Sequence, residues 1–414
     1  MTLVVLGSAS AYAQSTGERS APAASTSTSG RSCESLASLA LPHAKITSAE
    51  LVAAGAFRAP NAGRGAAAYA QLPAFCRVAA TLTPSPDSQI QMEIWLPAEN
   101  WNGKFLAVGN GGWAGTISLD AVAAGLRRGY AAASNDTGHS DAGAQFALSQ
   151  DKLIDFAYRA MHEMTVQSKT IVGAFYNRPP RLSYYQGCST GGRQGMMEAQ
   201  RYPDDFDAIV AGAPVYNMVH LNVSQTALQV HMLKNPERIV PPNKVALIAN
   251  AATAACDPND GVKDNIINDP RACKFDPGML ACKAGDGTDC LTTGEVESAR
   301  QLYLPVKTKS GHVVYPGRSP GVESGWAARI PVAGKPVSPL WGDMPRFVGH
   351  RDANWDAMSF DLEQDLALTL KNASFIEASD PNLSKFKARG GNRRGNCRPR
   401  SRPRRRSADC RRRR

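Results

Sequence analysis

The feature that most constrains the fold is the run Gly187-Cys188-Ser189-Thr190-Gly191, a G-x-S-x-G pattern. The segment 181–186 before it is typical of a strand, and a helix is predicted from about Gly192 to Arg201 after it. A serine between such a strand and helix lies on a sharp turn that needs flanking glycines, because Cβ atoms would collide there. The turn exposes the hydroxyl, so Ser189 is the candidate nucleophile. The alternative is a serine N-cap in an ordinary β–α loop.

A nucleophilic serine also needs two backbone N–H groups that stabilise the developing oxyanion. The N–H of Thr190, at the start of the predicted helix, is one candidate. The second is expected from the glycine loop 109–112, which follows the short apolar strand 104–108 and has no bulky side chain to block a substrate. We therefore predict Thr190, Gly111 and Gly112 as oxyanion donors. The alternative for the loop is a plain turn.

Strands alternate with helices between Cys76 and Pro214, which predicts an α/β protein with a mostly parallel sheet covered by helices on both faces. The predicted strands are 76–83, 89–97, 104–108, 129–134, 181–186 and 206–210, and a long helix is predicted over 146–176. Residues 217–373 lack this alternation, are rich in turns and contain four clustered cysteines. We interpret them as an inserted cap with little regular sheet, in which 360–370 is a helix.

The remaining members of a catalytic triad, a histidine base and an acid, are expected after the serine in the chain. None of the seven histidines follows His350, and His139 precedes the serine. His220, His231, His312 and His350 lie in the predicted cap, where packed or solvated roles are expected. The sequence therefore predicts a nucleophile without its acid and base.

A second group of polar residues, CDPNDGVKDNI, spans 256–266. Its carboxylates Asp257, Asp260 and Asp264 surround a glycine turn, and hard cations prefer such oxygen ligands. The spacing does not fit an EF-hand, so we expect either a calcium loop of another kind or an acidic solvated turn. A Cys256–Cys273 bridge would close this loop and contribute roughly 3 kcal/mol by loop entropy. We also propose the pairs Cys33–Cys76 and Cys282–Cys290.

The net charge of +11 is concentrated at one end of the chain. Residues 392–414 contain 12 Arg and one Asp, and the other 391 residues carry 35 basic and 35 acidic side chains. Phosphate binding by this tail is possible in principle. We expect no nucleic-acid function, because no aromatic residue is interleaved and no recognition module accompanies the tail. No run of 18 apolar residues occurs, so no membrane partner is expected.

The N-terminal residues end in Ala11-Tyr12-Ala13, an A-x-A cleavage pattern after a short apolar segment. We interpret 1–13 as the remnant of a secretory signal and 14–31 as a flexible leader. Nine cysteines fit an exported protein, so a secreted or periplasmic location is expected.

Four motifs resemble the tannase/feruloyl esterase family of secreted α/β-hydrolases, which includes hydrolases of monohydroxyethyl terephthalate. They are GNGG (109–112), GCSTGG (187–192), DDFDAIVAGAPV (204–215) and CDPNDGVKDNII (256–267), and the similarity covers roughly 33–391. The resemblance implies an α/β-hydrolase fold with a large lid and Ser189 as nucleophile. It implies that Cys188 is a tether to a cysteine that follows the catalytic histidine. It also implies a structural calcium bound by Asp257, Asp260 and Asp264 and by the carbonyls of Val262 and Ile266.

The chain departs from the family after residue 391, where members continue with a strand, an H-G-x-x-D segment with the acid, and a later His-Cys pair. The arginine-rich 392–414 replaces them, which suggests a shifted reading frame. We therefore expect a core at 32–216, a lid at 217–373, a truncated return to the core at 374–391 and a tail at 392–414. The predicted function is a secreted serine carboxylic ester hydrolase for small aromatic esters, acting through an acyl-enzyme and impaired in this chain. The alternative is a catalytically dead, calcium-dependent binding protein for aromatic esters.

Overall fold

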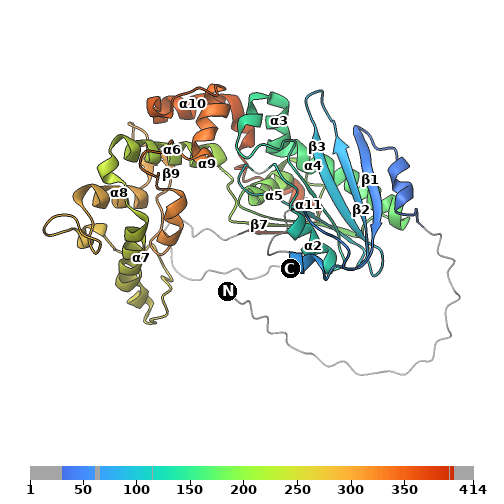
Figure 1. Cartoon of the computed structure of the whole chain (residues 1–414), viewed down its shortest axis with the longest axis horizontal. Helices are drawn as coiled ribbons and strands as arrows, with labels where there is room; N and C mark the ends of the chain where they lie inside the picture. Colours follow the sequence, from blue (N-terminus) through green and yellow to red (C-terminus); the bar gives the residue numbers. More distant parts are fainter. Residues whose placement is uncertain (1–29, 61–65, 114, 391, 396–414) are drawn as a thin grey trace.

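A computed structural model describes residues 30–60, 66–113, 115–390 and 392–395, and its core is one eight-stranded sheet (Figure 1). The strand order is β1-β2-β3-β5-β4-β6-β7-β10. The strands are β1 (Ala44–Val52), β2 (Phe75–Leu82), β3 (Ile90–Pro97), β4 (Lys104–Val108), β5 (Ala131–Asn135), β6 (Leu182–Cys188), β7 (Ala208–Gly212) and β10 (Asn392–Gly395). Neighbouring strands are antiparallel from β1 through β2 and β3 to β5. They are parallel from β5 through β4, β6 and β7 to β10.

Each parallel crossover carries a helix, as the alternation of elements predicts. α2 (Leu119–Arg127) connects β4 to β5, α4 (Ala160–Tyr176) precedes β6, and α5 (Thr190–Arg201) connects β6 to β7. β4 is buried on both faces: Phe105 and Ala107 belong to the apolar cluster that includes residues of α4, whereas Leu106 and Val108 belong to the cluster that includes residues of α2. Successive strand side chains point to opposite faces. The continuous apolar run of β4 therefore follows from helices on both sides of the sheet.

The predicted helix over 146–176 is a succession of helical segments. They are the 3₁₀ turn Gln145–Leu148, α3 (Gln150–Ile154), the π-helical turn Asp155–Arg159 and α4. The buried Asp155 carboxylate accepts a hydrogen bond from Ser88 Oγ (2.7 Å) and also pairs with Arg159. The helix therefore becomes π-helical at the residues that contact the turn between β2 and β3.

One expectation for the end of the core is wrong. We expected the arginine-rich tail to replace the last core strand, but Asn392–Gly395 forms β10, parallel to Ala208–Ala211 of β7. Backbone N–H and C=O groups at a sheet edge pair with any extended segment that reaches them. The pairing therefore does not depend on an apolar sequence. The expected signal remnant and most of the leader, 1–29, and the rest of the tail, 396–414, lie outside the described residues.

The predicted lid, 217–373, is mainly helical and lies to one side of the sheet (Figure 1). It contains α6 (Met218–Lys234), α7 (Pro242–Cys256), α8 (Thr293–Tyr303), α9 (Pro339–Asp343), α10 (Leu362–Ala373) and the short pair β8 (Val306–Lys307) and β9 (Val313–Tyr315). Part of it has a separate apolar cluster, which includes Met232, Ile248, Leu302 and Trp326. Helix α6 has no apolar stripe in its sequence, because it is buried around its whole circumference and some of the buried residues are polar, including Asn222, Gln225 and Gln229. The apolar periodicity of the sequence therefore does not predict it.

Three disulfides form: Cys33–Cys76, Cys256–Cys273 and Cys282–Cys290. These are the three pairings expected from the sequence. The two remaining α-helices are short: α1 (Ala66–Tyr69) and α11 (Ser384–Ala388). The second of them leads back to the sheet. Among the described residues, no helix has both the length and the apolar character needed to cross a bilayer.

Candidate active site

Ser189 lies on a strained turn between β6 and α5. Its backbone has φ 58° and ψ −119°, a conformation that L-residues rarely adopt, and the residue is exposed. The turn is fixed from both sides, because Ser189 N donates to Gly212 O (3.1 Å) and Arg193 N donates to Ser189 O (3.0 Å). The strain at Ser189 is therefore held by β7 and by the first turn of α5.

The two glycines of the motif are required by close backbone approaches. A Cβ at Gly187 would lie 2.5 Å from Gly191 O, and a Cβ at Gly191 would lie 2.9 Å from Asn110 O. Real Cβ atoms essentially never come that close to a backbone oxygen. Larger residues at either position would push the strand, the helix and the glycine loop apart.

The glycine loop 109–112 docks directly on the serine turn. Gly191 N donates to Asn110 O (2.8 Å), and Thr190 Oγ1 donates to Gly112 O (2.8 Å). As the first residue of α5, Thr190 has a backbone N–H without an intrahelical acceptor. Gly111 borders open space, where a Cβ would meet no atom within 4 Å. The predicted oxyanion residues are thus brought together beside Ser189.

A buried polar network beneath the loop was not predicted. Gln194 Nε2 donates to Asn110 Oδ1 (3.1 Å), and Asn110 N donates to Gln194 Oε1 (3.1 Å). Tyr185 OH donates to Gly191 O (2.6 Å), and Asn110 Nδ2 donates to Asn135 O (2.8 Å). Asn110 lies 84 residues from Gln194 and 25 from Asn135, and no local pattern marks them as partners.

No histidine ring among the described residues hydrogen-bonds to Ser189. His139 is buried with both ring nitrogens unpartnered, and its ring stacks on Phe146 with centroids 3.8 Å apart. Burial lowers the pKa of His139 to about 4, so the ring is neutral at neutral pH. The other ring partners are Asp205 for His162, Glu377 for His220, Arg238 for His231 and Asp365 for His350.

Comparison with known proteins now identifies the family. The family described as "Tannase and feruloyl esterase" matches residues 76–393. The chain belongs to this family. An uncharacterized esterase of Xanthomonas campestris is 35% identical over 386 residues, which are 88% of this chain and 66% of that protein. A protein named "Probable feruloyl esterase B-1" of Aspergillus flavus is 34% identical over 322 residues, which are 76% of this chain and 60% of that protein.

Solved structures agree with this assignment. Feruloyl esterase B from Aspergillus oryzae superposes with a TM-score of 0.79 at 32% identity, covering 88% of this chain and 73% of that one. Tannin acyl hydrolase from Aspergillus niger gives a TM-score of 0.69 at 21% identity, covering 86% and 71%, and shows the fold alone. The fold is that of an α/β-hydrolase. The chain spans less than two thirds of the length of the two curated relatives named above.

In this tannase-family chain, the exposed thiol of Cys188 forms no disulfide with any cysteine that the structure describes. Cys188 lines an open cavity of about 420 Å³ that also contacts α2, together with Leu106, Gln186 and Val210. Its expected role as a tether stays a prediction. Cys397 and Cys410 lie outside the described residues.

The predicted calcium loop is tightly folded by its own carboxylates. Asp257 Oδ1 accepts from the backbone N–H of Asp264 (3.1 Å) and of Ile266 (3.2 Å). Asp260 Oδ1 accepts from Val262 N (3.0 Å), and Asp264 Oδ1 accepts from Ile266 N (3.1 Å). Within the described chain, the second oxygen of each carboxylate and the carbonyls of Val262 and Ile266 accept no hydrogen bond. The oxygen-only donor set suits a hard cation, but the described structure does not bring ligand atoms of all three carboxylates within 4.8 Å of one another.

Proposed function

We propose that this chain carries the nucleophile and oxyanion groups of a serine carboxylic ester hydrolase for esters of aromatic acids. The observation that carries the proposal is the exposed, strained Ser189 at the N-terminus of α5, with the glycine loop docked against it. The names of the relatives support an aromatic, feruloyl-type ester. Ser189 Oγ would attack the ester carbonyl, the alcohol would leave, and water would hydrolyse the acyl-enzyme.

We also propose that turnover by this chain is impaired. Attack by Ser189 requires a base that accepts the hydroxyl proton, and no ring of a described histidine hydrogen-bonds to Ser189. His139 is buried against Phe146, and the rings of His162, His220, His231 and His350 contact other partners. The loss of triad members lowers kcat by roughly 10³–10⁶-fold, although the oxyanion groups retain some catalysis.

Methyl ferulate hydrolysis by the chain and by Ser189→Ala tests both proposals. We expect slow hydrolysis by the parent that is accelerated by added imidazole, because a small base can replace the missing one. The Ser189→Ala variant corrects for hydrolysis by imidazole itself. Turnover at about 1–10³ s⁻¹ without imidazole, abolished in Ser189→Ala, would disprove the impairment. Equal rates for both proteins under all conditions would disprove the nucleophilic role.

The second candidate is a catalytically dead, calcium-dependent binding protein for aromatic esters. It is favoured by the same observation, that no described histidine hydrogen-bonds to Ser189. It predicts saturable binding of methyl ferulate or methyl gallate without turnover, measured by calorimetry. Absence of binding to folded, calcium-loaded protein would eliminate this candidate.

We propose a structural calcium at Asp257, Asp260 and Asp264, with the carbonyls of Val262 and Ile266. The Cys256–Cys273 bridge and the free carboxylate oxygens support the assignment. Bound calcium would neutralise the carboxylates and hold the loop. After metal removal, added calcium should raise the melting temperature of the parent and have a smaller effect on Asp264→Asn. An equal effect on both would contradict the assignment.

We propose a secreted or periplasmic location, supported by the three disulfides, which form in oxidising compartments.

A further inference from the structure

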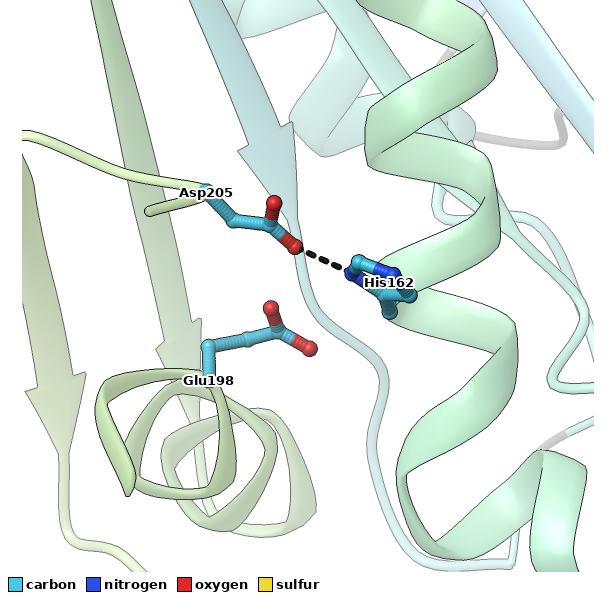
Figure 2. Close-up of side chains that lie close together, drawn as sticks. All are labelled: His162, Glu198 and Asp205. Atoms are coloured by element: carbon cyan, nitrogen blue, oxygen red, sulfur yellow. Dashed lines mark hydrogen bonds and ion pairs between the residues drawn. The ribbon is translucent and has the colours of Figure 1, made fainter. Parts of the chain in front are cut away.

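Three side chains on the α4–α5 side of the core converge away from the candidate active site. His162 comes from α4, Glu198 from α5, and Asp205 from the loop between α5 and β7 (Figure 2). Each offers one ligand atom, and these atoms all lie within 4.8 Å of one another. In the part of the chain that the structure describes, this is the one such group of three or more His, Cys, Asp or Glu side chains.

Glu198 is the residue that needs an explanation. It is fully buried, and neither of its carboxylate oxygens has a hydrogen-bond partner among the described residues. Figure 2 shows its carboxylate directed toward Asp205 and His162. A buried carboxyl of this kind binds either a proton or a cation, because a buried unpaired carboxylate costs several kcal/mol.

The other two ligands are already oriented. His162 Nδ1 lies 2.6 Å from Asp205 Oδ2, and the His162 ring stacks on Tyr202 with centroids 3.8 Å apart and planes within 7°. Lys169 Nζ donates to the backbone oxygen of Asp205 (2.6 Å), so this bond leaves the Asp205 carboxylate available. The His162 side chain is 28% exposed, which gives water and ions a route to the group.

We propose that His162, Glu198 and Asp205 form a binding site for a zinc-class divalent metal ion. One imidazole nitrogen and two carboxylate oxygens are a donor set that suits zinc, and a water would complete four-coordination. Ligands at about 2.0–2.1 Å from a tetrahedral ion lie roughly 3.3 Å from one another. The metal therefore takes the place of the proton between His162 and Asp205 and requires only small side-chain shifts.

The site joins α4 to α5, the helix that begins directly after Ser189. Metal binding would stabilise the packing of this helix on the core by linking segments 36 or more residues apart in the sequence. This inference is independent of the proposed ester hydrolysis, because it concerns the opposite end of α5.

Zinc titration of metal-stripped full chain by calorimetry, with metal content measured by mass spectrometry, tests the proposal. Parent and variants all carry Cys188→Ser, because an exposed thiol also binds zinc. We expect the parent to bind one equivalent more than Glu198→Gln and to gain melting temperature with zinc, whereas Glu198→Gln gains less. Glutamine resembles the protonated glutamic acid, so this variant is expected to fold.

A second variant tests the proposal in case Glu198→Gln does not fold. His162→Gln keeps both carboxyls but removes a direct ligand. It should weaken zinc binding at least as much as the loss of a residue that only orients a ligand, which is about tenfold or more. The matched control is His350→Gln. His350 pairs with Asp365 as His162 pairs with Asp205, but no third carboxylate completes that group in the described structure. The His350→Gln variant should therefore bind zinc like the parent. If the parent binds no zinc, or if Glu198→Gln and His162→Gln both bind it as the parent does, the proposal is wrong and Glu198 instead holds a proton beside Asp205.

Discussion

At the residue scale, the geometry of Ser189 has a cost that can be measured. Its φ of 58° and ψ of −119° lie in a region that only glycine adopts readily, and such strain costs about 1–3 kcal/mol. The backbone conformation that exposes the Ser189 hydroxyl therefore lowers the stability of the folded protein.

Replacing Ser189 with glycine should relieve the strain. We expect Ser189→Gly to be more stable than Ser189→Ala by about 1 kcal/mol, because alanine keeps the strain and the greater chain entropy of glycine offsets only part of the gain. Urea unfolding of the two variants measures this difference. An alanine variant as stable as the glycine variant would mean that the turn is not strained.

Asp136 gives a prediction on pH. Burial raises the pKa of Asp136 from 3.8 to about 7, although its Oδ1 accepts from Gln91 N (3.0 Å) and Gly138 N (2.8 Å). The folded state therefore binds this proton more tightly than the unfolded state. The Asp136 contribution to the free energy of unfolding is complete below about pH 4 and is lost as the pH rises to about 7.

Asp136→Asn should remove this loss, because asparagine keeps the Oδ1 acceptor and cannot ionise. Relative to the parent, we expect the variant to gain stability between pH 4 and 7, by at most about 4 kcal/mol at the upper end. Denaturant unfolding across this pH range measures the difference. A difference that does not change with pH would show that Asp136 titrates normally.

At the scale of elements, the position of α5 depends on a backbone contact between its first turn and the glycine loop. Gly191→Ala would place a Cβ 2.9 Å from Asn110 O, whereas a Cβ at Gly173, inside α4, meets nothing within 4 Å. The same substitution therefore has opposite expected effects in the two helices.

We expect Gly191→Ala to destabilise the protein by about 1–3 kcal/mol through overpacking. Gly173→Ala should stabilise it by up to about 1 kcal/mol through helix propensity. Thermal unfolding of both variants checks the signs. Stabilisation by Gly191→Ala would mean that the loop moves away at little cost.

At the scale of the whole molecule, Arg193 connects the core to the segment that returns from the lid. Its buried guanidinium on α5 donates to Phe156 O (2.9 Å), Ala157 O (2.7 Å) and Ile376 O (3.3 Å). Burial lowers its pKa to about 10, so the group stays charged at neutral pH. The side chain thus links α5 to two segments that are distant from it in the sequence.

Arg193→Met should destabilise the protein by about 3 kcal/mol or more, because buried carbonyls left unpaired cost about 1–3 kcal/mol each. The matched control is Arg201→Met on the same helix, where the exposed guanidinium lies over Tyr158 and contributes about 0.5–1 kcal/mol. Urea unfolding compares the two variants. Equal losses would contradict the connecting role of Arg193.

The sequence by itself determined the serine turn, the glycine loop, most core strands and the three disulfides. Most of these features are encoded within short stretches, since glycine spacing, apolar periodicity and closely spaced cysteines act locally. The exception is the Cys33–Cys76 pair, whose members are 43 residues apart. The tertiary structure alone decided the pairing of Asn392–Gly395 with β7, the contacts of Arg193 and the group His162, Glu198 and Asp205. Their members lie far apart in the sequence. His162 meets Glu198 and Asp205 because helices α4 and α5 pack on the same sheet, and no local pattern specifies which side chains face each other across that contact.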